Sequence, residues 1–226
     1  MMLRKIKALF FSIEFIISII SVVIFMFCFR KSIHKIRQIW AKTQRFFGGY
    51  SLKVEGKLDE SANMVILNHA SMLDIVIMEE ISPKNLCWVA KKEIGEIPII
   101  GQILKIPKMI PLERSNPRAV VKMLKEAKER VSEGRVIAIF PEGTRTDGIT
   151  IGKFKNGAKM LADKLDLNVQ PVLLVGTNIM DSKRFSFGSG EIKVIFLPIV
   201  DTTDENWLQN TKEMMQARLD LELSKK

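Results

Sequence analysis

The sequence predicts an α/β fold, in which a largely parallel mixed sheet is flanked by helices and preceded by an N-terminal helical segment. Short apolar segments of strand length alternate with helical segments after about residue 52, which is typical of a substantially parallel sheet. The 226 residues suffice for one globular domain with a sizeable core and an appendage. Composition changes near residue 50, so we expect one unit at residues 1–50 and the α/β domain at residues 51–226.

Residues 8–29 form a run that is apolar except for Glu14 and three serines. The run is long enough to cross a bilayer, which takes about 20 residues as a helix. Basic residues flank both ends and therefore indicate no orientation. They are Arg4, Lys5 and Lys7 before the run, and Arg30, Lys31, Lys35 and Arg37 after it. No small-residue cleavage site follows the run, which argues against a cleaved signal peptide.

The segment Ser32–Phe47 has the pattern of an amphipathic helix. Its apolar positions are Ile33, Ile36, Ile39, Trp40, Phe46 and Phe47, and Lys35, Lys42 and Arg45 are polar. A basic helix with one Trp and two Phe suits the plane of a membrane interface, and the alternative is an ordinary helix packed on the body. We hypothesise that residues 1–47 lie in one leaflet, because a carboxylate such as Glu14 costs about 2.5–3.5 kcal/mol at mid-bilayer. A tilted spanning helix is the alternative.

The formal charge of +10 is concentrated near the N-terminus. Residues 1–60 hold eleven Lys/Arg and four Asp/Glu, whereas the remaining residues hold 24 and 21. Because the folded body carries little of the excess, an anionic membrane surface is favoured over nucleic acid as the partner. The two cysteines, Cys28 and Cys87, lie in apolar surroundings and are interpreted as small core residues. Low cysteine content indicates a reducing compartment, most simply the cytoplasm.

Strands are expected at Met64–Leu67, Leu86–Ala90, Val136–Phe140, Val169–Val175 and Ile192–Leu197. The clearest helix between them is Pro117–Glu133. Asn116 is a good cap, Pro117 suits the first helical position, and Gly134 suits the end. The stretch from Asp204 to Leu223 is expected to form a closing helix.

The sharpest local signal is the segment NHASMLD at 68–74, directly after the strand MVIL. A neutral imidazole at a strand end can accept a proton from a hydroxyl if a carboxylate orients its other ring nitrogen. Asp74 is the nearest such carboxylate to His69. Positions five apart lie about 140° apart on an ideal helix, so the pair requires His69 on the turn and Asp74 in the first helical turn. The alternative is a structural histidine.

The second signal is FPEGTR at 140–145, directly after the strand RVIAIF. Gly143 lets backbone approach a ligand closely, and Thr144 offers a hydroxyl. Arg145 offers a planar fork that suits phosphate oxygens. The alternative is a turn that carries a surface arginine.

Two glycine-rich segments do not fit nucleotide-binding motifs. The segment at 148–153 has the wrong glycine spacing for a phosphate-binding loop, and Phe154 replaces the required Ser or Thr. The segment at 188–190 lacks the third glycine of a dinucleotide fingerprint. A third signal, IPLER at 110–114, places Arg114 where it could face an anionic substrate, and Lys91 follows another strand. Each of these two cations also has a solvated surface residue as its alternative.

Taken in order, these segments resemble the glycerolphosphate acyltransferase family, most closely its 1-acylglycerol-3-phosphate acyltransferases. The matching segments are NHASMLD at 68–74, VAKKEI at 89–94, IPIIG at 97–101, IPLER at 110–114, FPEGTR at 140–145, FKNGA at 154–158 and VQPVLLVG at 169–176. They span residues 65–176 and cover about half of the chain. The His-Asp block followed about 70 residues later by FPEGTR is a specific combination.

The resemblance implies a role for each matching residue. His69 would be the general base and Asp74 its orienting partner. The acceptor-phosphate site would comprise Arg114, Glu142, Gly143, Thr144 and Arg145. Lys91 matches a common family lysine, and Glu113 stands where the family often has Asp, which leaves the Arg114 assignment intact.

The resemblance also implies a reaction and a location. An acyl group would pass from acyl-CoA or acyl-carrier protein to the 2-hydroxyl of lysophosphatidic acid, forming phosphatidic acid. No cofactor and no metal are implied. The protein is expected on the cytoplasmic face of a membrane, the inner or plasma membrane in a bacterium, held by anionic lipids.

Three alternatives stay open at this stage: an acyltransferase for glycerol 3-phosphate or another lysolipid, a lipid hydrolase, and a non-enzymatic anchoring protein. The missing G-x-S-x-G elbow argues against the hydrolase. Because Ser71 lacks that context, direct transfer is preferred over an acyl-enzyme. The intact His69, Asp74, Glu142 and Arg145 argue against the non-enzymatic protein.

Overall fold

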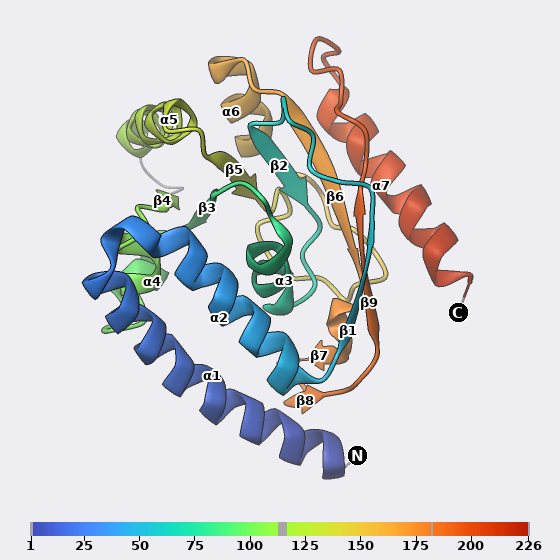
Figure 1. Ribbon diagram of the computed structural model, residues 1–226. Coiled ribbons are helices and arrows are strands. Elements are labelled where there is room, and N and C mark those ends of the chain that lie inside the picture. The colour runs from blue at the N-terminus through green and yellow to red at the C-terminus, as the bar shows by residue number, and fades with distance from the viewer. Residues whose placement is uncertain (1, 113–116, 182, 226) are drawn as a thin grey trace.

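Within residues 2–112, 117–181 and 183–225, which the computed structural model describes, seven strands form one mixed sheet (Figure 1). Their order across the sheet is β1-β9-β6-β2-β5-β3-β4. The bounds are β1 (Ser51–Glu55), β2 (Met64–Leu67), β3 (Leu86–Lys91), β4 (Ile110–Leu112), β5 (Val136–Ile139), β6 (Val169–Val175) and β9 (Glu191–Phe196). Every neighbouring pair is parallel except β6 and β9, which are antiparallel. The predicted α/β class with a largely parallel mixed sheet is confirmed.

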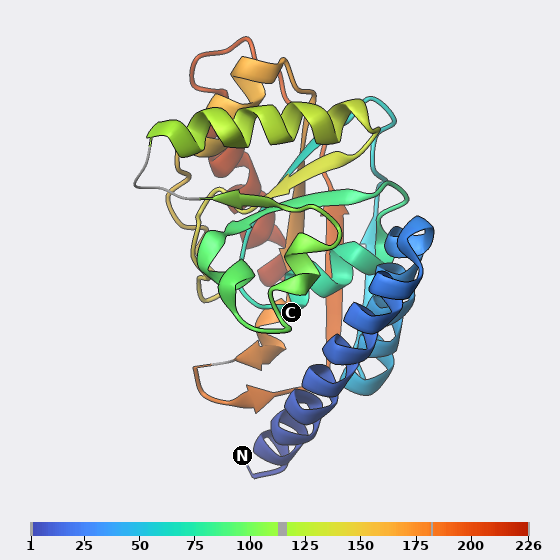
Figure 2. The ribbon, with the colours of Figure 1, turned by 90° about the vertical axis from the view of Figure 1, so that its left-hand side faces the viewer.

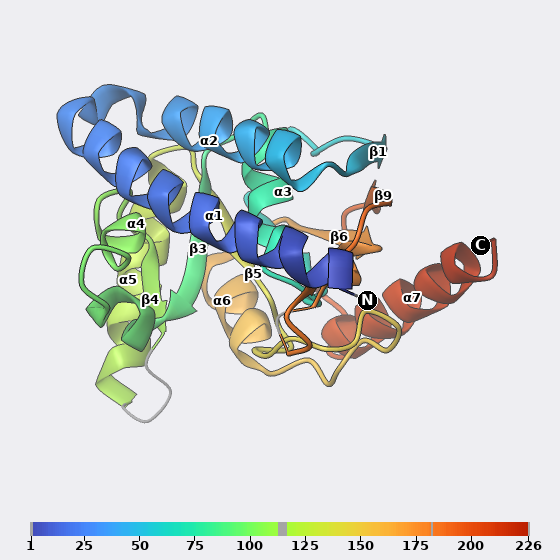
Figure 3. The same cartoon turned by 90° about the horizontal axis from the view of Figure 1, so that it is seen from below.

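Helices cover both faces of this sheet, and Figure 3 shows α1, α2 and α3 on one side and α5, α6 and α7 on the other. Their bounds are α1 (Met2–Cys28), α2 (Ile33–Gly48), α3 (Leu73–Ile81), α5 (Pro117–Ser132), α6 (Gly157–Leu165) and α7 (Trp207–Leu223). Side chains of a strand alternate between its faces, so β2 contributes to two cores. Met64 and Ile66 pack in the core under α5, α6 and α7, whereas Val65 and Leu67 pack in the core under α3.

Shorter elements complete the chain. They are α4 (Gln102–Lys105), the 3-10 turns η1 (Arg30–Ser32), η2 (Lys92–Glu96) and η3 (Thr177–Ile179), and a two-stranded ribbon of β7 (Met180–Asp181) and β8 (Ser186–Phe187). The sequence analysis placed no strand at β1, β4, β7 or β8. Burial explains this for β1, four of whose five residues are exposed, so that no apolar pattern marks it.

The predicted element boundaries agree within a few residues. β2 and β6 begin and end where expected, and α5 ends at Ser132, where Gly134 adopts a φ of +74° that favours glycine. Asn116, the expected cap, lies outside the described residues. Phe140 was expected to end β5, but the strand ends at Ile139, so the Phe140 side chain belongs to the following loop.

α1 is, among the described helices, the one that is long and apolar enough to cross a membrane, with 27 residues and an 18-residue stretch whose mean hydropathy is 2.6. It lies along the body of the protein, with its N-terminus beside the β7–β8 ribbon (Figure 2). Lys7 Nζ donates to the backbone oxygen of Gly188 at 2.8 Å, and the Phe11 ring packs edge-on against Phe187. Near its other end, Met26 packs with Ile106. α1 therefore contacts the body at two well-separated points.

α2 is amphipathic, as predicted. It buries polar and small residues against the protein, whereas a helix on the surface of a soluble protein normally buries its apolar side. The residues that it buries are Arg37, Ala41, Gln44 and Gly48. The exposed side chains include Ile39, Phe46 and Phe47. The helix thus packs on the body through its small and polar side and exposes Phe46 and Phe47, so the expected packing on the body is confirmed and the interfacial position stays a prediction.

Two polar groups in the helical segment differ from the simplest expectation. Glu14 accepts a hydrogen bond from Gln44 Nε2 at 3.0 Å, so its carboxylate faces α2. Cys28 is exposed, and its interpretation as a small core residue was wrong, because the end of α1 turns this side chain away from the body. Cys87 is buried as expected, and burial raises the pKa of its thiol to about 11.

Candidate active site

The turn between β2 and α3 is fixed to the neighbouring strand by Asn68. Its amide Nδ2 donates to the backbone oxygen of Leu174 at 2.9 Å, and its Oδ1 accepts from the Leu174 N–H at 2.8 Å. These two bonds continue the pattern between β2 and β6 by one residue after β2 ends. His69, the next residue, therefore leaves the sheet at a defined point.

His69 and Asp74 form a direct pair. The distance from His69 Nδ1 to Asp74 Oδ2 is 2.8 Å, and the same oxygen accepts the backbone N–H groups of Ala70 and Ser71 at 2.8 Å each. Asp74 has no exposed side-chain surface and lies in the first turn of α3, where the helix dipole favours a negative charge. Because a carboxylate accepts the Nδ1 proton, Nε2 is left as the basic nitrogen. The His69 side chain keeps 15% of its surface exposed, so a substrate can reach it.

A flat aromatic stack covers one face of the His69 imidazole. The centroids of the His69 and Phe140 rings are 3.9 Å apart, with 14° between their planes. The Trp88 indole is also stacked with Phe140, with ring centroids 5.3 Å apart and 19° between the planes. The sequence analysis did not include these two aromatic residues in the site, and the position of Phe140 at the start of FPEGTR is the signal that could have found it.

Glu142 supports the backbone of His69. Its Oε1 accepts the His69 N–H at 2.7 Å, its Oε2 accepts the Gly152 N–H at 2.6 Å, and only 2% of the residue is exposed. A Cβ at Gly152 would lie 2.9 Å from Oε2, so glycine permits this approach. Burial raises the pKa of Glu142, and the two backbone N–H groups oppose that shift. The resemblance implied that Glu142 binds the acceptor phosphate. In the structure, each of its carboxylate oxygens instead accepts a hydrogen bond from a backbone N–H group.

The rest of the 140–146 loop wraps around the same histidine. Gly143 has a φ of +67°, which glycine adopts without strain. Thr146, a residue absent from the sequence-based site, donates to the His69 backbone oxygen from both its N–H, at 2.8 Å, and its hydroxyl, at 3.2 Å. Thr144 and Arg145 lie between them and are exposed. The loop thus holds His69 and presents a hydroxyl and a guanidinium to solvent beside it.

Lys91 ends β3 and is exposed. Because β3, β5 and β2 are parallel neighbours, Lys91 and the residues that follow β5 and β2 lie at the same edge of the sheet. Lys91 lines a hollow of about 310 Å³ that is bordered by two further lysines and by apolar side chains. The whole lining is Lys91, Lys92, Gly95, Glu96, Leu104, Lys105, Met109, Ile110 and Pro111. Arg114 lies outside the described residues.

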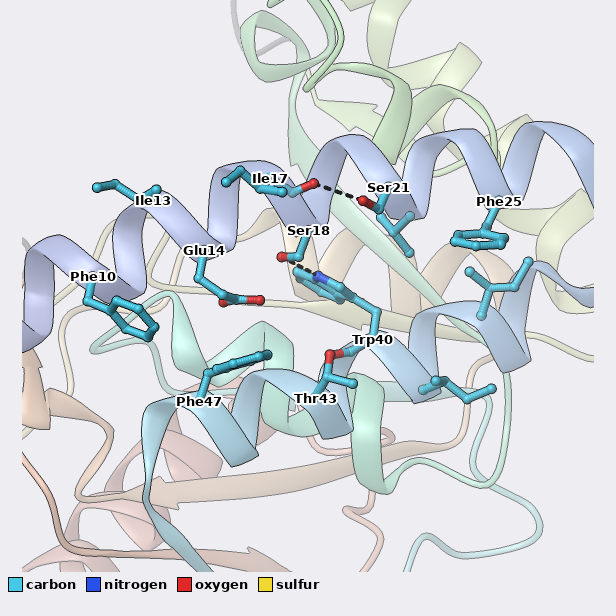
Figure 4. Close-up of a pocket in the computed structure, with 13 residues that line it drawn as sticks. Phe10, Ile13, Glu14, Ile17, Ser18, Ser21, Phe25, Trp40, Thr43 and Phe47 are labelled. Atoms are coloured by element: carbon cyan, nitrogen blue, oxygen red, sulfur yellow. Dashed lines mark hydrogen bonds between the residues drawn. The ribbon is translucent and has the colours of Figure 1, made fainter.

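A larger hollow of about 690 Å³ lies between α1 and α2, and all of its lining residues come from these two helices. Figure 4 shows Glu14 pointing across it toward α2, with the Trp40 indole hydrogen-bonded to Ser18 at 3.1 Å. The lining is otherwise mostly apolar. In the part of the chain that the structure describes, no group of three or more His, Cys, Asp or Glu side chains is placed to hold a metal ion.

Comparisons with known proteins identify the family of the chain. A family model described as "Acyltransferase" matches residues 51–175. The 1-acyl-sn-glycerol-3-phosphate acyltransferase of Helicobacter pylori is 33% identical over 219 residues, which cover 94% of this chain and 92% of that protein. The chloroplastic 1-acyl-sn-glycerol-3-phosphate acyltransferase LPAT1 of Arabidopsis thaliana is 34% identical over 66% of this chain and 42% of that protein.

A solved structure shares the fold. The crystal structure of the 1-acyl-sn-glycerophosphate (LPA) acyltransferase PlsC from Thermotoga maritima superposes with a TM-score of 0.81 at 24% identity. The match covers 100% of this chain and 98% of that one, so the N-terminal helices are included. The family model spans more than half of the chain and contains the His69–Asp74 pair and the 140–146 loop. The chain belongs to the acyltransferase family.

Proposed function

We propose that the protein transfers a fatty acyl group from a thioester to the 2-hydroxyl of lysophosphatidic acid, forming phosphatidic acid for phospholipid synthesis. The observation that carries the proposal is the 2.8 Å contact between His69 Nδ1 and Asp74. It orients an accessible imidazole with Nε2 free to act as a base. The names of the most similar relatives support this choice of acceptor.

In the proposed step, Nε2 of His69 takes the proton of the acceptor hydroxyl as its oxygen attacks the thioester carbonyl carbon. A C–O bond forms, the C–S bond breaks, and the departing thiolate recovers the proton from the imidazolium. Asp74 stabilises that imidazolium and keeps its orientation. General-base catalysis contributes about 10²–10⁴-fold, and positioning of the two substrates contributes further. The mechanism uses no cofactor and no metal.

Negative charge develops on the thioester oxygen and must be stabilised. The N–H groups of His69, Ala70 and Ser71 each donate to a carboxylate, at 2.7–2.8 Å. We therefore place the stabilising donors outside this turn. Lys91, the last residue of β3 at the same sheet edge, is one candidate.

The acceptor phosphate is assigned to the cations at this edge. Arg145 is exposed beside His69, and Thr144 adds a hydroxyl. An arginine fork binds phosphate oxygens in pairs, which a carboxylate such as Glu142 cannot do. Arg114 and Gly143 are retained in this proposed phosphate site on the strength of the motif match.

We further propose that α1 and α2 hold the enzyme on the cytoplasmic face of a membrane, in one leaflet. Leu3, Phe10, Ile17 and Phe27 are among the exposed apolar side chains of α1, and α2 exposes Phe46 to 81%. Such exposed side chains are stable in the hydrocarbon boundary of a leaflet. The excess of basic residues before residue 60 favours anionic lipids. This position would bring a one-tailed acceptor to His69 without its leaving the membrane.

The deciding experiment is a lipid assay with purified protein in detergent micelles. The acceptors are lysophosphatidic acid, glycerol 3-phosphate and a zwitterionic lysolipid, each with acyl-CoA and with acyl-carrier protein. We expect phosphatidic acid as the main product. Preference for another acceptor would replace the proposed substrate, and release of free fatty acid without transfer would identify a hydrolase.

A further inference from the structure

A buried ion pair joins the N-terminal helices to the catalytic domain. Arg37 of α2 and Glu79 of α3 approach to 2.9 Å, and their side chains are only 6% and 4% exposed. The guanidinium also donates to the Asn85 side chain and to the backbone oxygen of Leu86, the first residue of β3. Removing two charges from water is costly, so the pair is not explained by its contribution to stability alone.

The same Glu79 oxygen holds an aromatic residue of the sheet. Trp88 Nε1 donates to Glu79 Oε1 at 2.7 Å, and the indole is almost completely buried. A hydrogen bond at the edge of a ring fixes its rotation about the side-chain axis. Arg37, Glu79 and Trp88 are therefore connected through a single carboxylate oxygen.

Trp88 in turn lies against Phe140, and Phe140 lies against His69. In both stacks the ring planes are nearly parallel, with centroids 5.3 Å apart at 19° for Trp88 and Phe140 and 3.9 Å apart at 14° for Phe140 and His69. The contact from Asp74 restrains the imidazole at one atom, Nδ1, and would leave the ring free to tilt about that bond. A flat ring against its face removes this freedom and fixes the direction of Nε2.

We propose that Arg37, Glu79 and Trp88 are positioning residues that set the plane of the His69 imidazole through Phe140. The helical pair at the N-terminus would then be part of the catalytic framework as well as an anchor. The inference rests on the proposed role of His69 as the base, and adds that its orientation depends on a helix outside the α/β domain. The physical reason is that small displacements of a catalytic group lower turnover strongly.

The chain provides a matched control for this proposal. Arg45 and Glu80 join the same two helices at the same distance, 2.9 Å, but the hydrogen bonds and ring contacts of the described residues do not link them to Trp88. Replacing each pair by two glutamines, as R37Q/E79Q or R45Q/E80Q, removes the charges without leaving one unpaired. The Arg45–Glu80 pair is more exposed, at 36% and 9%, so it controls for the loss of an ion pair between the two helices but not for its burial. Trp88→Phe removes the Nε1 donor together with part of the indole ring and keeps the ion pair, so it tests the link from Glu79 to Phe140 if R37Q/E79Q does not fold.

The readout is the imidazole itself, observed by NMR in detergent-solubilised, histidine-labelled protein. The sequence has two histidines, so the His69 signal is identified as the one missing from the His69→Ala variant. In the folded protein, the ring current of Phe140 displaces this signal from its free-imidazole position. We expect W88F and R37Q/E79Q to move it, and to lower kcat about tenfold while KM changes little. R45Q/E80Q should leave the signal and kcat unchanged.

Two results would overturn the inference: an unmoved His69 signal in W88F, or a moved signal with wild-type kcat. The proposed function is tested separately by the His69→Ala variant. If that variant kept its turnover, the general-base role would fall, whereas the NMR signal would still report whether Arg37, Glu79 and Trp88 position the ring.

Discussion

The backbone N–H of His69 donates to the carboxylate of Glu142 at 2.7 Å, across 73 positions of the sequence. The two best-defined motifs of the chain therefore meet at this contact, in which the carboxylate of one holds the backbone of the proposed base in the other. This relationship changes how Glu142 is expected to act. A substitution there should affect the position of His69 more than the binding of an anionic acceptor.

We expect Glu142→Gln to lower both stability and kcat. A glutamine offers one acceptor oxygen, so the N–H of either His69 or Gly152 would lose its partner. An unpaired buried donor costs about 1–3 kcal/mol in the free energy of unfolding. Denaturant titration and steady-state kinetics measure the two effects, with Glu60→Gln at an exposed position as the control. A KM effect on the acceptor without loss of kcat would contradict the assignment.

His69→Ala should abolish acyl transfer while the fold and membrane association are retained. Asp74→Asn should be severely impaired, because an amide cannot stabilise the imidazolium or fix the Nδ1 proton in the same way. Turnover of each variant is compared with its circular dichroism and thermal melting. Activity of His69→Ala within about tenfold of wild type would refute the general-base mechanism.

Arg145→Ala and Arg114→Ala should weaken use of the acceptor. The loss of a charge-assisted hydrogen bond to phosphate corresponds to about 1.5–3 kcal/mol in kcat/KM. Lysine at either position should rescue only in part, since it lacks the planar fork. Arg184→Ala, at an exposed position on the β7–β8 ribbon, is the control. If KM for the thioester rose instead, these arginines would belong to the donor site.

The charged cluster around Glu222 should make stability depend on acid pH. Hydrogen bonds from Lys193 and Lys225 lower the pKa of this carboxyl from 4.5 to about 2. Because the folded-state pKa lies below the unfolded value, the stabilisation is complete above pH 4.5 and is lost as the pH falls toward 2. The Tm of wild type should fall more steeply across this window than that of Glu222→Gln. Glu205→Gln should follow wild type, and parallel curves for all three proteins would refute the role of the cluster.

The leaflet position of α1 can be tested by labelling. Its contacts at Lys7 and Met26 hold the helix along the body, so we expect Met2 on the same side of the membrane as the catalytic domain. Met2→Cys, in a variant without Cys28 and Cys87, should react with an impermeant reagent only from that side. High salt alone should not release the protein, because apolar contacts dominate its attachment. Labelling from the opposite side of sealed vesicles would show a spanning helix.

Much of the architecture follows from local patterns in the sequence. β2 and β6 were predicted at their observed bounds, because fully buried strands form nearly continuous apolar runs, which in β6 only Gln170 interrupts. The His69–Asp74 pair could also be predicted from the sequence. Both residues belong to one short strand-to-helix turn, and their spacing allows the contact only if His69 lies on the turn and Asp74 in the first helical turn. The order of the motifs gave the family, and the structure brings Glu142 and Thr146 of the second motif's loop to this turn.

Contacts between distant segments were decided only by the tertiary structure. Neither the carboxylate of Glu142 under His69 nor the stack of Trp88 on Phe140 has a sequence pattern, because partners brought together by parallel strands are separated by whole helices. The same holds for α2: periodicity reveals that a helix has an apolar face but not which face is covered. Here Arg37 and Gln44 are buried and Phe46 is exposed, since the protein supplies polar partners on one side and an apolar leaflet is proposed on the other. The sequence by itself determined the five central strands β2, β3, β5, β6 and β9 and the His69–Asp74 pair, and the packing of remote segments determined how that pair is held.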